Sequence, residues 1–328
     1  MINTEKLDTR FRNLFKNGQL VQVNVRKWSM CVSVSPQDLG INTDPEKQEV
    51  IPEFISLGRK NLFTNDVRLK FSRIESCARN YLNLNSHKFP VADAHFVPQK
   101  ALIKVRTTLD QYREEYDKAT QDFIANYEKH KQKMFDTFPD HTAKLQPFYP
   151  SVEQIRSKFS FNVTSYEVAF PQHLKSTSMT DIVAQNMAAE AHSKKYEAQM
   201  KLQYDQQMRQ MEEFVQSSAL AMRNKIVETF EVIAEKIKGK EVVTATNLKT
   251  LKNVIDSFDA LDFLDDTKVR EGLASVKKLV ESGADFKDNA TALARLETAL
   301  NTTLDTAKNM SDVDEITGGY IRRLDLTL

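Results

Sequence analysis

The sequence predicts a mostly α-helical protein of the α+β class, with a long antiparallel helical hairpin or coiled-coil stalk, a small β element and a C-terminal helical bundle. Residues 172–238 contain neither glycine nor proline, whereas a chain built from many tight turns needs both. Apolar residues recur at steps of three and four through 101–136 and 180–238, which is the spacing of a helix face. Two shorter stretches, 20–34 and 159–170, alternate apolar and polar residues as strands do.

Residues 1–100 are expected to form a mixed α/β region. The alternation from Leu20 to Val34 shifts by one residue near Arg26 and Lys27, which predicts a strand with a bulge. Helices are predicted over residues 6–15, 52–63 and 66–84, and a proline-containing segment over 89–98.

Residues 101–240 are expected to form a long helical stalk that a β segment interrupts at about 150–171. Between Leu102 and Phe123 the apolar residues alternate steps of three and four, the heptad pattern of a coiled coil. The interrupting strand, Phe159 to Phe170, is expected to pair with the strand over 20–34.

The helix predicted over 180–238 carries an apolar stripe that is longer than the helix over 101–136 can cover. Packing within the chain accounts for part of the stripe. An apolar surface left uncovered usually marks a contact with another protein, so we predict that the N-terminal part binds a protein partner or a second copy of the chain. The residues assigned to this partner-binding stripe are Tyr196, Met200, Tyr204, Met208 and Met211.

Residues 241–328 are expected to form a helical bundle followed by a tail. Apolar residues at helical spacing mark three helices within residues 239–310. Residues 311–328 are interpreted as a tail, in which Gly318 and Gly319 precede the apolar Tyr320, Ile321 and Leu324.

The composition is that of a folded, water-soluble chain. The 46 Lys and Arg nearly balance the 45 Asp and Glu, which argues against a dedicated nucleic-acid-binding protein. The sequence holds no apolar stretch of the roughly 18 residues that a membrane span needs, and no signal peptide. With only two cysteines, we expect a cytoplasmic protein with reduced thiols, in the host cytoplasm if a phage encodes it.

No residue pattern predicts catalysis, a cofactor or a metal. Glycine-rich phosphate loops, nucleophile elbows and zinc-binding helices are all missing from the sequence. Cys77, His87 and His95 match no zinc spacing, and the aspartates between 256 and 266 lack the glycine and glutamate of a calcium loop. We therefore expect a non-enzymatic protein with protein partners, rather than one that acts on a small-molecule substrate, nucleic acid or a membrane.

Several sequence blocks, taken in order, resemble an uncharacterised phage and bacterial family known only as a domain of unknown function. The blocks are VRKWSMCVSV, IPEFISLGRKNLF, SRIESCARNYL, FPVADAHFVP, FIANYEKHK, YPSVEQIRSKFSFNVTSYEV and LDFLDDTKVREGL. Members of that family are often encoded beside a MoxR-type AAA+ ATPase and a von Willebrand factor A-domain protein. The resemblance implies an adaptor or structural component near such an ATPase, and it transfers no catalytic residue.

The two long helices are also similar in outline to those of α-helical pore-forming toxins, which makes a membrane-active protein the alternative function. The hydrophobic segments that such a protein would expose are Phe214–Met222 and Phe159–Phe170. Both are too short to span a bilayer as a helix, and the chain departs from the toxins in having no apolar hairpin.

Overall fold

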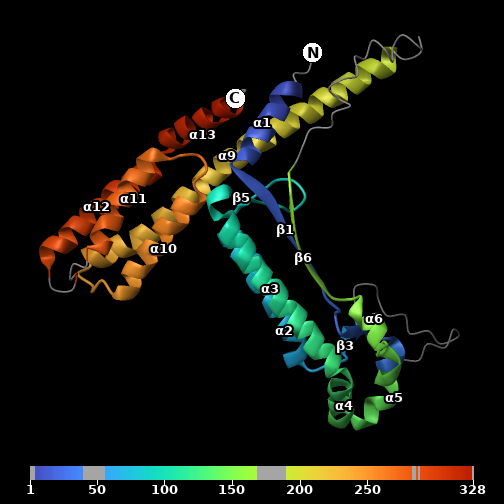
Figure 1. Ribbon diagram of the computed structural model, residues 1–328. Coiled ribbons are helices and arrows are strands. Elements are labelled where there is room, and N and C mark those ends of the chain that lie inside the picture. The colour runs from blue at the N-terminus through green and yellow to red at the C-terminus, as the bar shows by residue number, and fades with distance from the viewer. Residues whose placement is uncertain (1–3, 40–55, 168–189, 283–285, 287–288, 327–328) are drawn as a thin grey trace. The chain divides into compact units, whose positions relative to one another are not determined.

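The protein is mostly helical, with a small sheet (Figure 1). The computed structural model describes the chain apart from residues 1–3, 40–55, 168–189, 283–285, 287–288 and 327–328. The mostly α fold class predicted from the sequence is confirmed at this level.

The chain folds into two compact units, each assembled from separate stretches. Unit 1 comprises residues 1–22, 83–105 and 165–328, and unit 2 comprises residues 23–82 and 106–164.

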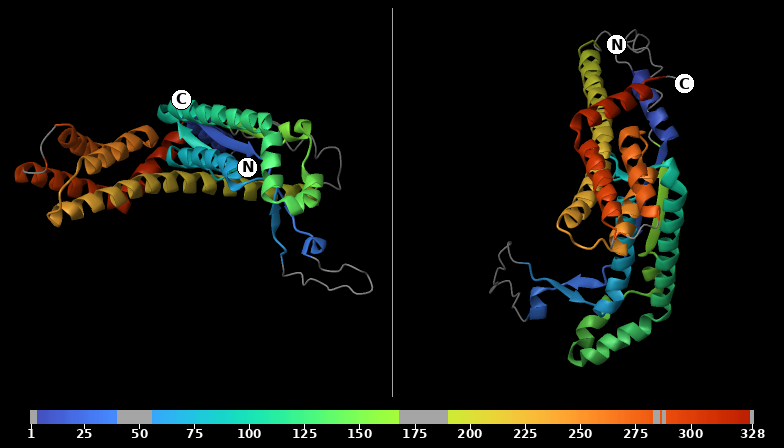
Figure 2. Two further views of the ribbon diagram at one scale, coloured as in Figure 1. Left: turned by 90° about the horizontal axis from the view of Figure 1, so that it is seen from below. Right: turned by 90° about the vertical axis from the view of Figure 1, so that its left-hand side faces the viewer.

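Unit 1 contains a helical bundle built on one long helix. Its helices are α1 (Thr4–Lys16), α9 (Glu190–Lys238), α10 (Ala245–Leu261), α11 (Thr267–Glu281), α12 (Ala290–Lys308) and α13 (Met310–Leu324). Helices α10, α12 and α13 pack against α9 (Figure 1 and Figure 2). The apolar stripe predicted on the long helix is buried within unit 1 at Met211, Val215, Ala219, Met222, Ile226, Phe230 and Ile233, and Phe214 beside it is buried too.

Three helices of the bundle begin directly after a residue whose side chain caps the helix N-terminus, and these capping residues fix where each helix starts. Thr244, Asp266 and Asn289 accept hydrogen bonds from the backbone N–H three residues further on, in α10, α11 and α12. These bonds satisfy donors that a helix N-terminus otherwise leaves unpaired.

The predicted tail after residue 310 is instead a helix, α13. Asn309 caps it by accepting a hydrogen bond from the Ser311 N–H. Its buried residues fall at steps of four, three and four, at Val313, Thr317, Tyr320 and Leu324. Burial of this face outweighs the low helix propensity of the two glycines within the helix.

The sheet has the strand order β4-β5-β1-β6, in which β1 spans Gly18–Arg26, β4 His87–Lys88, β5 His95–Pro98 and β6 Ser160–Tyr166. The predicted pairing between the first strand and the one near residue 160 is confirmed, since β6 lies next to β1. In unit 1, residues 18–21 of β1 pair antiparallel with β5, which pairs with β4. A side chain at Gly18 would collide with the Val97 carbonyl, so this close approach requires glycine.

Unit 2 is a helical layer on an aromatic core. Its helical elements are η1 (Pro36–Leu39), α2 (Asn65–Leu84), α3 (Gln99–Ala125), α4 (Tyr127–Thr137), η2 (Pro139–His141), α5 (Thr142–Leu145), η3 (Gln146–Phe148) and α6 (Val152–Arg156); α2 and α3 also contribute residues to unit 1. The rings of Phe71, Tyr116, Phe123 and Phe159 contact one another, with centroids 4.8 to 6.4 Å apart. Tyr116 and Phe123, two of the heptad residues predicted in 101–136, therefore pack into this core.

Three predicted elements of unit 2 differ in the structure. The strand expected to run to Val34 ends at Arg26 and resumes as β2 (Cys31–Ser33), because Met30 adopts a positive φ of 52°. The helix expected over 52–63 is, where described, the strand β3 (Arg59–Asn61), which pairs with β2.

The third difference is a break at Asn126 between α3 and α4, where one helix was expected. The Asn126 side chain donates to the Asp122 carbonyl at 2.9 Å, the same acceptor that its own N–H uses at 3.1 Å. Asparagine side chains compete in this way for backbone groups, which makes the residue a weak helix former.

Candidate functional site

The partner-binding stripe predicted on the long helix lies on α9, and the structure describes two of its five side chains. Met211 is 2 % exposed within unit 1. Met208 is half-buried, with its Sδ 3.7 Å from Nη1 of Arg10. The side chains of Tyr196, Met200 and Tyr204 lie outside the described residues. The C-terminal end of the stripe is therefore packed inside the chain.

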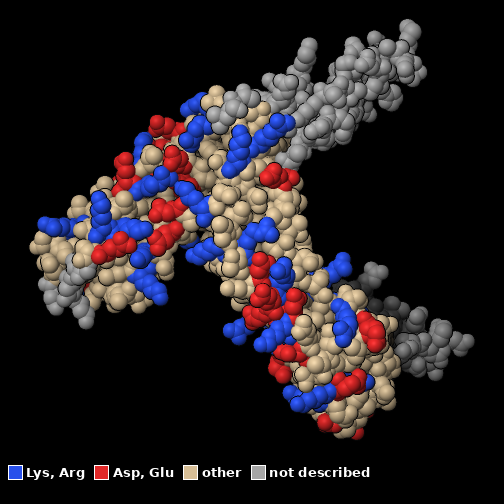
Figure 3. All heavy atoms as spheres, in the orientation of Figure 1, with Lys and Arg blue, Asp and Glu red and all other residues tan. Residues whose placement is uncertain are grey.

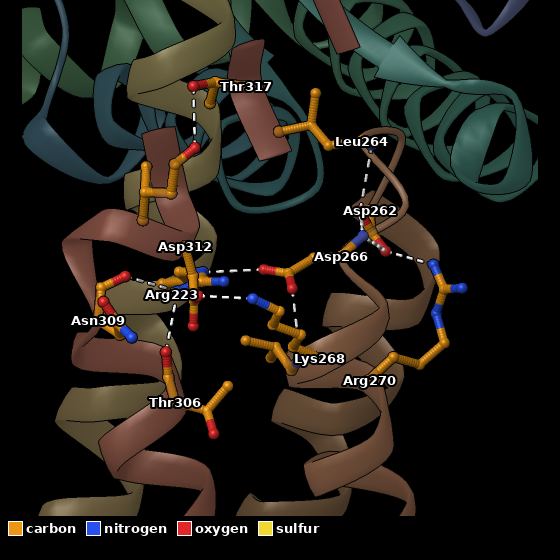
Figure 4. A network of polar contacts seen from close by, with 12 residues as sticks. Arg223, Asp262, Leu264, Asp266, Lys268, Arg270, Thr306, Asn309, Asp312 and Thr317 are labelled. Carbon is orange, nitrogen blue, oxygen red and sulfur yellow. Dashed lines mark hydrogen bonds and ion pairs between the residues drawn. The ribbon is translucent and has the colours of Figure 1, made fainter. Parts of the chain in front are cut away.

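A buried ion pair joins the helices of unit 1 (Figure 4). Arg223 of α9 is 1 % exposed, and its Nε donates to Oδ2 of Asp266 at 2.8 Å. Its Nη1 donates to the carbonyls of Thr306 and Asn309 at 2.9 and 3.1 Å. Since Asp266 also caps α11, one guanidinium holds α9, the start of α11 and the end of α12 together.

Aspartates between residues 256 and 266 form hydrogen bonds and ion pairs within unit 1. Asp262 is buried and accepts hydrogen bonds from the N–H groups of Leu264, Asp265 and Asp266, and it also pairs with Arg270. Asp256 binds Lys277 at 2.9 Å on the surface. Basic and acidic side chains alternate over the C-terminal helices (Figure 3), so that face carries no single-sign patch.

Unit 2 carries an open cleft of about 570 Å³ among β2, β3, the start of α2, and the segment from α4 to α5. We call it the aromatic cleft. Its floor is apolar and buried, formed by Phe63, Met134 and Leu145. At its rim Phe138 is 46 % exposed.

Contacts with neighbouring aromatic rings fix the position of Phe63 in the floor. The Phe63 ring meets Trp28, Phe123 and Tyr149 edge-on, with centroids 5.6, 5.3 and 5.5 Å away. The Tyr149 hydroxyl donates to the Leu62 carbonyl at 2.6 Å, and burial raises the pKa of Tyr149 to about 12. Edge-on ring pairs add directional stabilisation to their burial, so the floor is preorganised.

One wall of the cleft is a fixed charge pair. Lys60 Nζ lies 2.8 Å from Oδ2 of Asp38, which also accepts from the N–H and hydroxyl of Ser35, both at 2.7 Å. The hydrogen bond from Lys60, followed by those from Ser35, holds the pKa of Asp38 well below its usual range. Lys60 also lies 4.3 Å from the ring centroid of Phe148, which is 40 % exposed.

Two asparagines that line the cleft present hydrogen-bond donors. Arg68 Nη1 donates to the amide oxygens of Asn61 and Asn65, at 2.6 and 3.3 Å. The two asparagines therefore present their N–H₂ groups. His141 and Lys144 line the same cleft and are exposed.

Sequence reasoning did not find this cleft. Its residues come from a strand near position 60 and from helices after position 130, and no local spacing connects the two stretches. The one available signal is the run FDTFPDH over 135–141, where two phenylalanines follow an amphipathic helix and precede a proline.

The described part of the chain contains no cluster of His, Cys, Asp and Glu placed to hold a metal ion. None of the described helices combines the length and apolar character that crossing a bilayer demands. Of the segments considered for membrane activity, Phe214 and Met222 are buried in α9, and Phe161 is buried in β6.

Comparison with known proteins assigns the chain at the level of a family. No curated protein matches it, and no solved structure matches it. A family model described as "Protein of unknown function (DUF3150)" matches residues 15–227, which is more than half of the chain. The match includes unit 2 with its cleft and ends within α9. The predicted resemblance to a domain of unknown function is confirmed: the chain belongs to the DUF3150 family.

Proposed function

We propose that this chain is a non-enzymatic interaction protein that binds a protein partner through the aromatic cleft of unit 2. The observation that carries the proposal is a pair of exposed rings, Phe138 and Phe148, beside a buried apolar floor and a polar wall. Aromatic anchors at a preformed depression, surrounded by polar groups, are characteristic of the energetic centres of protein interfaces.

The energy available at these two rings suits a protein contact. At about 25 cal/mol per Å² of apolar surface, burying the exposed part of each ring contributes about 2 kcal/mol. Association costs offset part of this gain. The two rings alone therefore support a weak complex, and further contacts around the cleft set its affinity.

The partner we propose is a MoxR-type AAA+ ATPase, with this chain as its adaptor. This part of the proposal rests on the sequence resemblance described above, in which family members neighbour such ATPases. We also propose that copies of the chain associate through the part of the α9 stripe that includes Tyr196, Met200 and Tyr204. Coiled-coil pairing of residues 101–136 with 180–238 is not part of the proposal, because apolar residues of these faces pack in the aromatic core of unit 2 and in the bundle of unit 1.

Co-purification tests the proposal directly. The full chain is expressed with a MoxR-type AAA+ ATPase from the same genome, and the ATPase is captured by a tag. We expect the wild-type chain to elute in fixed ratio with the ATPase and the double variant Phe138→Asp, Phe148→Asp to be lost.

The matched control is Leu69→Asp on α2, another apolar residue of unit 2, which is 63 % exposed and does not line the cleft. It should be retained. Circular dichroism confirms that both variants are folded. Equal retention of the two variants, or no recovery of the wild-type chain, contradicts the proposal.

A further inference from the structure

We infer that the aromatic cleft binds an acidic peptide segment, with an apolar side chain of the peptide on the Phe63 floor and a carboxylate against Lys144 and His141. The inference rests on the proposed function and specifies the chemistry of the ligand.

The first step is the shortage of hydrogen-bond acceptors in the cleft. Among the described residues that line it, Asp38 is the single carboxylate, and its Oδ2 is occupied by Lys60 and by two groups of Ser35. The amide oxygens of Asn61 and Asn65 are both taken by Arg68. The N–H₂ groups that the two asparagines still offer are donors, so a ligand that brings acceptors matches them.

The second step is the charge. Lys60 is balanced by Asp38, but in the part of the chain that the structure describes Lys144 has no carboxylate within ion-pairing distance. Lys144 and His141 are both exposed where they line the cleft. Asp136, on α4, accepts a hydrogen bond from Gln132 at 2.8 Å. The described residues that line the cleft therefore carry a surplus positive charge, which favours a carboxylate ligand.

The third step is the apolar surface. A small anion would use Lys144 and His141 but would leave the floor and the exposed Phe138 ring uncovered. A peptide segment covers both, because its backbone reaches along an open cleft while one side chain enters it. A volume of about 570 Å³ lies within the range of ligand pockets and holds a few residues.

The protein carries its own reporter for this test. Trp28 is the single tryptophan of the sequence, and its ring centroid lies 5.6 Å from that of Phe63 in the cleft floor. Its fluorescence is followed while the full chain is titrated with three peptides: acetyl-DEFDL-amide, its uncharged counterpart acetyl-NQFNL-amide, and the basic acetyl-KKFKL-amide. A fourth titration uses glutarate, a small dicarboxylate.

We expect the acidic peptide to bind at least about tenfold more tightly than the uncharged one, which corresponds to one charge-assisted contact of about 1.4 kcal/mol. The basic peptide and glutarate should bind more weakly still. Raising the salt concentration from about 0.05 to 0.3 M should reduce the advantage of the acidic peptide, because salt screens exposed charges.

Two variants locate the contact. Lys144→Gln should lower the affinity for the acidic peptide to that for the uncharged one and leave the uncharged peptide unaffected. Phe138→Ala should weaken both peptides. Lys118→Gln, on α3, is the matched control, since Lys118 is exposed in unit 2 and does not line the cleft.

Equal binding of the acidic and uncharged peptides overturns the inference, and so does glutarate binding as tightly as the acidic peptide. Loss of affinity in Lys118→Gln equal to that in Lys144→Gln also overturns it. If the ATPase is captured through Phe138 and Phe148 while the peptides show no charge preference, this inference fails and the proposed function stands. If the peptide preference is found and the ATPase is not captured, the inference stands and the assignment of the ATPase falls.

Discussion

Arg10 of α1 holds Asp325, the residue after α13, with two groups of its guanidinium, although 315 positions separate the two residues. The bond from Nη2 to Oδ2 is 3.0 Å long, and Nη1 donates to Oε1 of Glu212 on α9 at 3.0 Å. Asn13 adds bonds to the carbonyls of Leu324 and Leu326, at 3.0 and 2.8 Å. The first and last helices of unit 1 are thus joined to each other and to α9.

Removing the Asp325 carboxylate should destabilise unit 1. Arg10 is buried and pairs with two carboxylates, those of Asp325 and Glu212. Asp325→Asn leaves it paired with Glu212 alone, and we expect a loss of about 2–3 kcal/mol in the free energy of unfolding. Urea denaturation measures it. Lys268→Gln removes the pairs that an exposed lysine makes with Asp312 and Glu315, and it should cost much less, because water already solvates the lysine. Equal losses in the two variants would contradict this account.

The buried pair of Arg223 and Asp266 should show strong coupling. Arg223→Met or Asp266→Asn alone leaves a buried partner unpaired, and each should cost about 3–5 kcal/mol. The double variant should be more stable than the sum of the two losses predicts, because no uncompensated charge remains. Thermal and urea unfolding of all four proteins complete the cycle. Additive losses would mean that the two side chains act independently.

The close approach of α11 and α12 should depend on Gly272. A Cβ at this position would lie 2.7 Å from Oγ1 and 3.1 Å from Cγ2 of Thr303, whose hydroxyl is held by the Ala299 carbonyl. Gly272→Ala should therefore destabilise the protein by about 1–3 kcal/mol, although alanine is the better helix former. Adding Thr303→Ala removes both clashing atoms and should recover part of the loss. Melting temperatures test this, and a stabilised Gly272→Ala variant would refute the clash.

His87 should make stability sensitive to mild acid. It is buried, its Nε2 bonds the Leu261 carbonyl at 3.1 Å, and burial lowers its pKa to about 4. Between about pH 6.5, the ordinary histidine value, and about pH 4, the unfolded chain binds a proton that the folded chain excludes. Stability therefore falls with decreasing pH in that window, by about 1.4 kcal/mol per pH unit, and this contribution is constant above it.

His87→Gln keeps a side-chain donor for the Leu261 carbonyl but does not titrate. Urea unfolding at pH 7 and pH 5 should show a pH-dependent loss about 2 kcal/mol larger in the wild-type protein than in this variant. Parallel pH profiles of the two proteins would assign the acid sensitivity to other groups.

Two apolar residues of α9 should respond differently to the same substitution. Met211 is buried, so Met211→Glu places a charge in the bundle and should cost about 3 kcal/mol or more. Leu202 is 60 % exposed, and Leu202→Glu should leave the free energy of unfolding within about 0.5 kcal/mol. Chemical denaturation of the two variants separates these outcomes, and equal stability would mean that Met211 is not packed as described.

The parts of the fold that local patterns specify were predictable. Apolar residues at helical spacing predict the stripe on α9 and the three capped helices of the bundle. Alternating apolar and polar residues predict the pairing of β1 with β6. Strands β4 and β5 are only two and four residues long. No periodicity can develop over such a length, and their pairing is set by β1, far away in the chain.

The candidate site was not predictable for a related reason. Lys60 and Phe138 meet at one cleft only because β3 and α4 pack in the same unit. The donor character of the cleft depends on Arg68 occupying the oxygens of Asn61 and Asn65, and that geometry leaves no trace in the spacing of residues. Met211, which the sequence assigned to a partner surface, is instead buried in unit 1, where helices from later in the chain pack against α9.

The interleaved composition of the two units has a consequence for synthesis on the ribosome. All residues of unit 2 lie before position 165, so its aromatic core can close while later residues are still being translated. Unit 1 cannot fold as early, because Arg10 of α1 pairs with Asp325 and the apolar face of α9 packs against helices that are translated after it. The nascent chain therefore carries a folded unit 2 and an exposed apolar α9 for the time needed to translate the bundle, at about 5–20 residues per second. During that interval the apolar face of α9 is open to contact with other chains, which favours aggregation.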